Sequence, residues 1–346
     1  MRRIAVAKSR GPRGLWGPTF IEDVSLTRHG QDRGAHCPMT YFEIGIGLFP
    51  PDRYELEFIP PMPPIDTCDH DALISALLPA VREVGRLEMA HFHRGVEFEK
   101  KADRSPVTVA DREAEIVLLA ALAKFAPDIP VVAEEAMSAG AETGYARRFF
   151  LVDALDGTRL FIRGKPEFSV NIGLVEDGRA CFGLIFLPPS ERLFVTRSDG
   201  GAYEARLSLT DERPMSEIAF KRLSTRTPDP QALVAFNSRG AGSASAQLLA
   251  TLNVAEARPL GSAMKFCLIA AGEGDLYARF GETSEWDTAP GQAILEAAGG
   301  SVTTTDGEPL TYGHYEQGFR NPHFIAWGRQ PLWRSGDDAE RVGSSP

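Results

Sequence analysis

Two carboxylates stand three residues apart at the end of an apolar run. Residues 149–152 are typical of a buried strand, and Asp153 and Asp156 follow, with Gly157 and Thr158 directly after the second acid. Unpaired charge beside a core is unfavourable, so acids in this position indicate a bound cation. Gly157 permits a tight turn, and Thr158 favours the start of a short helix whose free N–H groups would face an anion. The D-x-x-D-G pattern also occurs in ordinary surface turns, and that alternative stays open.

Three further segments place an acid at the end of a predicted element. Glu134 follows a predicted strand over 129–133, Asp287 opens a predicted helix over 288–298, and Asp103 lies in a polar loop. Asp111 is expected only to cap or begin the helix after that loop. Converging carboxylates repel one another unless cations lie among them. An oxygen-only ligand set favours Mg²⁺ or Mn²⁺ over zinc, and it suits metal-assisted phosphoryl transfer to water.

Composition limits the partners of the chain. Its 346 residues include 43% hydrophobic residues, enough for a substantial core, and its net charge is −10. An acidic balance argues against duplex nucleic acid as a partner, but a small nucleotide needs only a local cationic pocket. The four cysteines form no C-x-x-C pair, which indicates reduced thiols. No apolar run reaches the length of a membrane span, and we expect a cytoplasmic protein without a transmembrane segment.

The chain divides into four parts by pattern. Residues 1–64 carry no motif, and we expect either a poorly ordered extension or a start assigned too early, ahead of Met62. Residues 65–210 show helical spacing and then antiparallel strands with a hairpin turn at 176–178. Residues 211–328 alternate strands and helices, and 329–346 form a polar tail. The expected fold class is mixed α/β, with a layered second lobe.

Four sequence blocks carry a family resemblance. KADRSPVTVAD (101–111), VVAEE (131–135), LVDALDGT (151–158) and EWDTAPG (285–291) occur in this order and resemble the lithium-sensitive, Mg²⁺-dependent phosphatases related to inositol monophosphatase. The resemblance covers roughly residues 66–328. It implies the layered αβαβα sandwich shared by inositol monophosphatase and fructose bisphosphatase. The first block and the run 261–281 are most similar to the 3′(2′),5′-bisphosphate nucleotidases of the CysQ type.

The resemblance implies a role for each matched residue. Two or three Mg²⁺ ions, or Mn²⁺, would be held by the Leu155 carbonyl and by four side chains, those of Glu134, Asp153, Asp156 and Asp287. Asp103 and Thr158 would orient and deprotonate the attacking water. The implied substrate contacts are Glu134, Gly157, Thr158, Ser238, Ser262, Lys265, Arg279 and Asp287. Among these, the N–H groups of Gly157 and Thr158 would hold the scissile phosphate.

The expected reaction is hydrolysis of the 3′-phosphate of adenosine 3′,5′-bisphosphate, and of its phosphosulfate as a second substrate, in support of sulfur assimilation. Lys265 and Arg279 stand where the subfamily contacts its second phosphate and ribose. Arg239-Gly240 replaces a histidine that often follows Ser238, which leaves recognition of the base or ribose open. Alternatives are an inositol-1-monophosphatase or histidinol-phosphatase on the same scaffold, and an inactive metabolite-binding protein. A peripheral position on the cytoplasmic face of the inner membrane is the alternative location.

Overall fold

The computed structural model describes residues 66–101, 105–141, 143–239 and 242–332, together with the backbone of three short strands nearer the N-terminus. The chain divides into two compact units, Met1–Met62 and Pro63–Pro346. In the first unit an antiparallel sheet has the order β2-β1-β3, with β1 at Ala5–Arg10, β2 at Trp16–Ile21 and β3 at Tyr54–Glu55. Our interpretation of residues 1–64 as an extension or a misassigned start stays a prediction.

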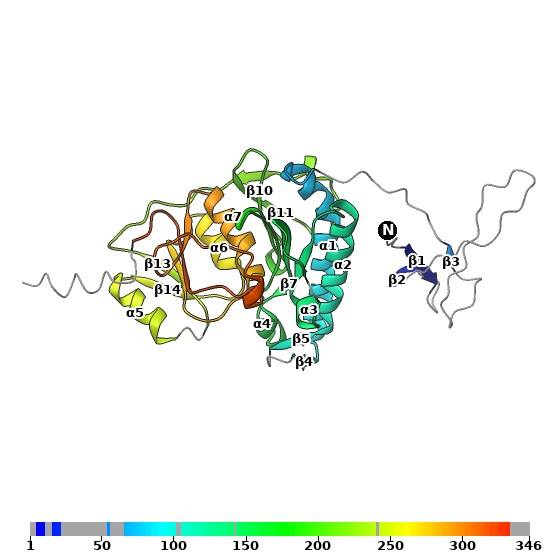
Figure 1. Ribbon diagram of the computed structural model, residues 1–346, viewed down its shortest axis with the longest axis horizontal. Coiled ribbons are helices and arrows are strands. Elements are labelled where there is room, and N and C mark those ends of the chain that lie inside the picture. Colours follow the sequence, from blue (N-terminus) through cyan, green and yellow to red (C-terminus); the bar gives the residue numbers. More distant parts are fainter. Residues whose placement is uncertain are drawn as a thin grey trace, which may run out of the picture. The chain divides into compact units, whose positions relative to one another are not determined.

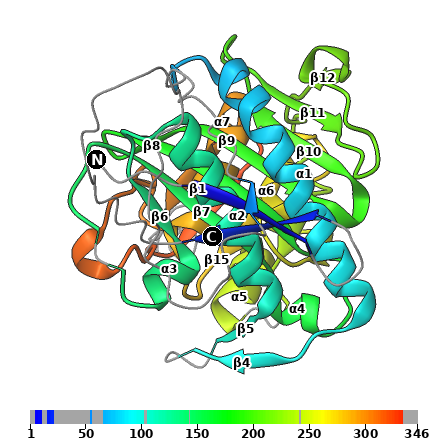
Figure 2. The ribbon, with the colours of Figure 1, turned by 90° about the vertical axis from the view of Figure 1, so that its right-hand side faces the viewer.

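The described part of the second unit is a stack of alternating helical and sheet layers (Figure 1). Helices α1 (His70–Arg94) and α2 (Val109–Phe125) cover one face of a seven-stranded sheet, as Figure 2 also shows. Helices α6 (Met264–Ala270) and α7 (Ala289–Ala297) lie between this sheet and a five-stranded sheet. Helix α5 (Ser243–Thr251) packs on the outer face of the five-stranded sheet. The predicted αβαβα sandwich is confirmed.

The seven-stranded sheet has the order β12-β11-β10-β9-β8-β7-β6. Its neighbouring strands are antiparallel, except that β6 and β7 are parallel. Its strands are β6 (Val131–Ala133), β7 (Arg148–Asp156), β8 (Ser169–Glu176), β9 (Arg179–Leu187), β10 (Arg192–Thr196), β11 (Ala202–Arg206) and β12 (Phe220–Arg222). Because β6 and β7 run in the same direction, their carboxyl ends meet at one edge of the sheet.

The five-stranded sheet has the order β14-β13-β15-β17-β16, with β13 parallel to both β14 and β15. Its strands are β13 (Val234–Asn237), β14 (Glu256–Pro259), β15 (Leu276–Arg279), β16 (Ser301–Thr304) and β17 (Phe324–Trp327). The remaining short elements are β4 (Phe98–Lys100), β5 (Pro106–Thr108), α3 (Glu134–Ser138), α4 (Thr158–Ile162), η2 (Pro188–Ser190), η3 (Met215–Glu217), η4 (Glu285–Asp287) and η5 (Tyr315–Gln317). The polar loop expected around Asp103 does not run directly into the next helix, because Pro106–Thr108 form β5, which pairs with β4.

The apolar run of β7 is continuous because helices cover both faces of its sheet. Phe150 and Val152 pack among residues of α1 and α2, whereas Phe149 and Leu151 pack on the side of α6 and α7. All four side chains are almost fully buried, and each contributes about 1.5–3 kcal/mol through removal of apolar surface from water. Strand β7 is thereby fixed from both sides, which holds the acids at its end in place.

Helix α1 begins where Asp69 caps it, since its carboxylate accepts the N–H groups of Asp71 and Ala72. Pro79 lies inside this helix without ending it. No helix in the described ranges is long and apolar enough to span a membrane.

Candidate active site

A β-bulge shapes the end of β7. Asp153 pairs with Asn171 of β8, but the next paired residue, Asp156, faces Ser169, so the register shifts between the two acids. The Asp153 carboxylate turns back and accepts the N–H of Leu155 at 3.0 Å. Bulges commonly redirect side chains beside active sites. Here the bulge places two acids and one carbonyl at the edge where β6 also ends.

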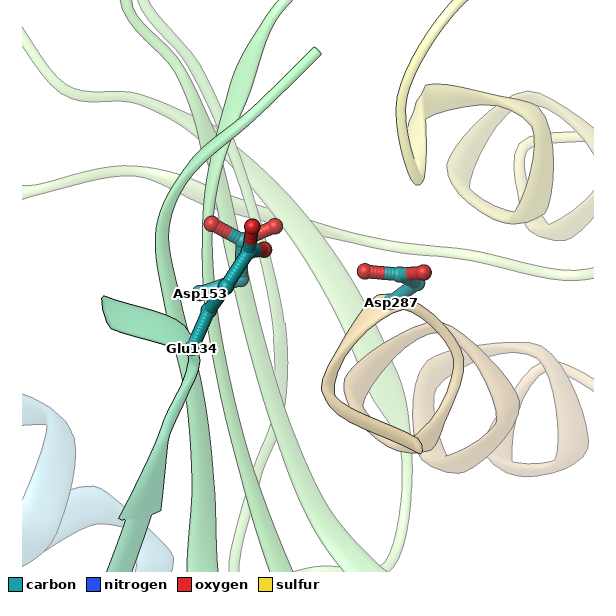
Figure 3. Close-up of side chains that lie close together, drawn as sticks. All are labelled: Glu134, Asp153 and Asp287. Carbon is teal, nitrogen blue, oxygen red and sulfur yellow. The ribbon is translucent and has the colours of Figure 1, made fainter. Parts of the chain in front are cut away.

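Three of the predicted ligands meet at this edge. Carboxylate oxygens of Glu134, Asp153 and Asp287 lie within 4.8 Å of one another (Figure 3). Glu134 begins α3 directly after β6, Asp153 lies in β7, and Asp287 ends η4, just before α7. Burial raises the pKa of Asp153 and of Asp287 well above its usual range, and the charges of the neighbouring carboxylates raise it further. The cluster therefore needs positive charge to stay ionised.

Lys101 supplies part of that charge. Its ammonium donates to Glu134 and to Glu135, each at 2.6 Å. Burial alone would lower the pKa of Lys101, but the charges and hydrogen bonds of Glu134 and Glu135 together outweigh burial and raise the pKa. The indole N–H of Trp286 donates to the second oxygen of Glu134 at 3.1 Å. Glu134 is thus oriented from two sides.

Asp156 lies outside the three-acid cluster and joins the two lobes of the unit. Its carboxylate accepts the N–H of Ala263 at 2.5 Å and the side-chain amide of Asn171 at 3.3 Å. Burial raises its pKa, and the ammonium of Lys265 opposes that shift. The role of Asp156 as a metal ligand stays a prediction.

The hydroxyl of Thr158 is bound to a buried acid. It donates to Asp111 at 2.8 Å and lies 3.2 Å from the Leu155 carbonyl oxygen. Asp111 also caps α2, as predicted, because its other carboxylate oxygen accepts the N–H and hydroxyl of Thr108. Burial raises the pKa of Asp111. Asp103, the acid predicted to act with Thr158, lies outside the described residues.

Glu88 of α1 is a second buried acid in this region. Its side chain is fully buried, and neither carboxylate oxygen has a hydrogen-bond partner among the described residues. Burial raises its pKa well above the usual range, and the charge of Asp111 adds to the effect. Its neighbours in sequence, Leu87 and Met89, pack against the apolar cluster that contains Leu155. Both effects favour the protonated form of Glu88.

The glycine that starts α4 makes a close contact. Gly157 has a φ of 103°, a left-handed conformation that favours glycine. A methyl group there would lie 2.7 Å from the carbonyl oxygen of Glu167, and one at Gly261 would lie 2.9 Å from the same oxygen. The loop after β7 and the loop before α6 thus enclose one backbone carbonyl.

The three clustered acids border one open pocket of about 920 Å³, together with Lys101, Asp156 and Thr158. Lys265 is 4% exposed, donates to the Ser262 carbonyl at 2.6 Å and lies 4.7 Å from the centre of the Tyr277 ring. Burial lowers the pKa of Lys265 to about 8, although the charge of Asp156 opposes the shift. The Arg279 guanidinium donates to the Glu282 carbonyl at 2.7 Å. Seven described cationic side chains line the pocket, namely Lys101, Arg159, Arg163, Arg239, Lys265, Arg279 and Arg320.

Comparison with known proteins gives the family. The sequence profile of the inositol monophosphatase family matches residues 69–327. This chain belongs to the inositol monophosphatase family. It is 37% identical over 229 residues to the 3′(2′),5′-bisphosphate nucleotidase CysQ of Salmonella typhimurium. The aligned region covers 66% of this chain and 88% of that protein.

Solved structures agree with this assignment. CysQ from Bacteroides thetaiotaomicron, described as a bacterial member of the family, has 30% identity and a TM-score of 0.62, with 75% of this chain and 98% of that chain covered. An inositol monophosphatase of Thermotoga maritima, 24% identical with a TM-score of 0.59, covers 72% of this chain and 90% of its own, and it shows the fold alone.

Every site residue predicted from sequence that the structure describes lines the pocket, and Asp103 lies outside the described residues. The shared set is Glu134, Asp153, Leu155, Asp156, Gly157, Thr158, Ser238, Ser262, Lys265, Arg279 and Asp287. Sequence reasoning missed the hydrogen bond from Thr158 to Asp111 and the pairing of Lys101 with two acids. The capping pattern at Thr108 and Asp111 was visible, but nothing in it indicated Thr158.

The donor set fits a hard divalent cation. The converging side chains in Figure 3 are all carboxylates, from three separate elements, and the cluster contains no cysteine or histidine. Oxygen ligands of this kind suit Mg²⁺ or Mn²⁺. Burial and the neighbouring carboxylates raise the pKa of Asp153 and Asp287, and a bound cation would offset both effects.

Proposed function

We propose that this chain is a Mg²⁺-dependent phosphatase that hydrolyses the 3′-phosphate of adenosine 3′,5′-bisphosphate to AMP and phosphate. The observation that carries the proposal is that one pocket is lined both by the carboxylate cluster and by several cationic side chains. Seven cationic side chains among the described residues line it, in a chain whose net charge is −10. A substrate with two phosphates would satisfy both halves of the pocket. Relatives named as bisphosphate nucleotidases support the choice.

Glu134, Asp153 and Asp287 would hold the cation, and the proposed further ligands are Asp156 and the Leu155 carbonyl. When bound, the cation would supply Lewis-acid stabilisation of the phosphate oxygens and lower the pKa of a water. Lys101 and Trp286 fix Glu134 through its two oxygens, so this ligand needs no reorientation.

Thr158 and Asp111 provide a path for the proton of the attacking water. The Thr158 hydroxyl already donates to Asp111, so its lone pairs are free to accept a hydrogen bond from a water. As the water attacks phosphorus, its proton would pass to the Thr158 oxygen while the Thr158 proton moves to Asp111. Burial raises the pKa of Asp111 and makes it a better base than an exposed aspartate. Asp103 remains an alternative for this role.

The rest of the substrate would lie along the cationic wall. The N–H groups of Gly157 and Thr158 are proposed to hold the scissile phosphate. Ser238, Ser262, Lys265 and Arg279 are proposed to contact the nucleotide and its second phosphate. Removal of this nucleotide would support sulfur assimilation, and the corresponding phosphosulfate is a proposed second substrate. The cytoplasmic location, with peripheral attachment to the inner membrane as the alternative, stays a prediction.

The test is phosphate release with Mg²⁺ at equal low concentrations of adenosine 3′,5′-bisphosphate and inositol 1-phosphate. We expect a preference of roughly a hundredfold for the nucleotide, equivalent to about 2.7 kcal/mol of differential transition-state binding. A preference for inositol phosphate would overturn the nucleotide assignment and leave the metal cluster in place. Absence of Mg²⁺-dependent turnover with any phosphomonoester would support an inactive binding protein instead.

A further inference from the structure

Arg239 follows β13 and lines the pocket. Its guanidinium pairs side-on with Glu167, with Nε 3.1 Å from one carboxylate oxygen and Nη2 2.5 Å from the other. The pair therefore occupies the edge of the guanidinium formed by Nε and Nη2, and leaves the edge formed by Nη1 and Nη2. Both N–H groups of Nη1 and one of Nη2 have no hydrogen-bond partner among the described residues. The Arg239 side chain is 45% exposed, so these donors are open to a ligand.

Glu167 holds this guanidinium rigidly. Its side chain is 14% exposed, and one of its oxygens also accepts the N–H of Gly261 at 2.8 Å. Gly261 directly precedes Ser262, whose carbonyl accepts the ammonium of Lys265. Arg239, through Glu167, and Lys265 are therefore both linked to the loop over 261–262, and both line the pocket. A pre-organised arginine fork loses little side-chain entropy when it binds an anion.

We propose that Arg239 binds the non-scissile phosphate of the substrate and thereby determines the preference for bisphosphorylated over monophosphorylated nucleotides. The inference rests on the proposed function and adds a residue to it. The free edge of the guanidinium presents two roughly parallel N–H groups, the geometry that matches two phosphate oxygens. Glu167 orients the fork from the other edge.

The experiment compares adenosine 3′,5′-bisphosphate with adenosine 3′-monophosphate, which differ only in the second phosphate. In Arg239→Ala we expect kcat/KM for the bisphosphate to fall roughly ten- to hundredfold, because a charge-assisted bidentate contact is lost. The loss should appear mainly in KM. We expect kcat/KM for the monophosphate to stay within about twofold of wild type. Arg239→Lys keeps the charge without the fork and should give an intermediate loss.

Arg258→Ala is the matched control. Arg258 forms the same side-on pair with Glu256, at 2.8 and 2.7 Å, and is 44% exposed. It lies in β14 and does not line the pocket. Its replacement should leave both substrates unaffected, while thermal unfolding of all variants checks that each is folded.

The outcomes separate the two proposals. A wild-type preference for the bisphosphate that survives in Arg239→Ala overturns the role of Arg239 and leaves the proposed function standing. An equal loss on both substrates shows that Arg239 only supports the loops, and it also overturns the role. Equal wild-type activity on both nucleotides overturns the inference, whereas the comparison with inositol 1-phosphate decides separately whether the proposed function stands.

Discussion

The buried acid Glu88 gives the sharpest prediction about the fold. The Glu88 carboxyl has no hydrogen-bond partner among the described residues, and burial raises its pKa, so we expect it to be neutral in the native state; in the unfolded chain it ionises near its ordinary pKa. The unfolded state then binds fewer protons than the native state. The contribution of Glu88 to the free energy of unfolding should therefore decrease as the pH rises above the ordinary pKa of glutamate. Glu88→Gln removes this proton linkage and keeps a neutral side chain of the same shape.

The magnitude follows from the linkage. For each pH unit in which Glu88 is protonated in the native state and ionised in the unfolded state, the wild type loses about 1.4 kcal/mol relative to Glu88→Gln. The two proteins should have similar stability near pH 4.5. Above that pH, the stability of Glu88→Gln relative to the wild type should increase steadily. In a domain of this size, each 1 kcal/mol corresponds to roughly 2–4 °C in Tm.

Urea unfolding at half-unit steps from pH 5 to pH 8, in the presence of a chelator, measures the difference. The chelator keeps metal binding at the active site from adding its own pH dependence. Glu83→Gln is the matched control, because Glu83 lies on the same helix with its side chain 55% exposed. Parallel stability curves for wild type and Glu88→Gln would refute the reasoning, since they would mean that Glu88 is ionised in the native protein.

Further predictions concern activity. Asp287→Asn should lose turnover by orders of magnitude with little change in Tm, since it removes a proposed metal ligand; wild-type activity would contradict the site. Thr158→Val should lower kcat by roughly 10²- to 10⁴-fold, whereas Thr158→Ser, which keeps the hydroxyl, should retain most of it; equal losses would exclude the proton path. KM for the bisphosphate should rise as the pH passes about 8, because Lys265 then loses its proton. In a pH series of initial rates, Lys265→Arg should remove this dependence. Millimolar lithium should inhibit phosphate release, as the family resemblance implies, and insensitivity would count against it.

The sequence was enough to predict features that depend on short stretches of chain. The run of β7 with Asp153 and Asp156, the acid after β6 and the helix after Asp287 are each local patterns, and the structure places them in one pocket. The layered fold followed from the family resemblance. Helical spacing from Leu77 through Val81 and Val84 also extends to Glu88, so the sequence contained a signal for this buried acid that polarity alone obscures.

Contacts between distant segments could not be predicted in the same way. Thr158 and Asp111 are 47 residues apart, and the pairing depends on how α2 packs beside β7. Arg239 and Glu167 are 72 residues apart and belong to different lobes. From the sequence Arg239 was only a departure from the subfamily pattern, because its partner is set by the docking of two loops. Local patterns indicate which residues do chemistry, but side-chain pairing across the fold decides how they are oriented.

The carbonyl oxygen of Glu167 restricts which residues are tolerated at two positions, one in each lobe. It leaves no room for a side chain at Gly157 or at Gly261, which are far apart in the chain. An alanine at either position would displace the same atom, so a first substitution would already disturb the contact that a second one would break. Double-mutant cycles at these two positions should therefore be non-additive. The sequences of the two lobes can vary independently elsewhere, but at this contact a substitution in one lobe depends on the residue in the other.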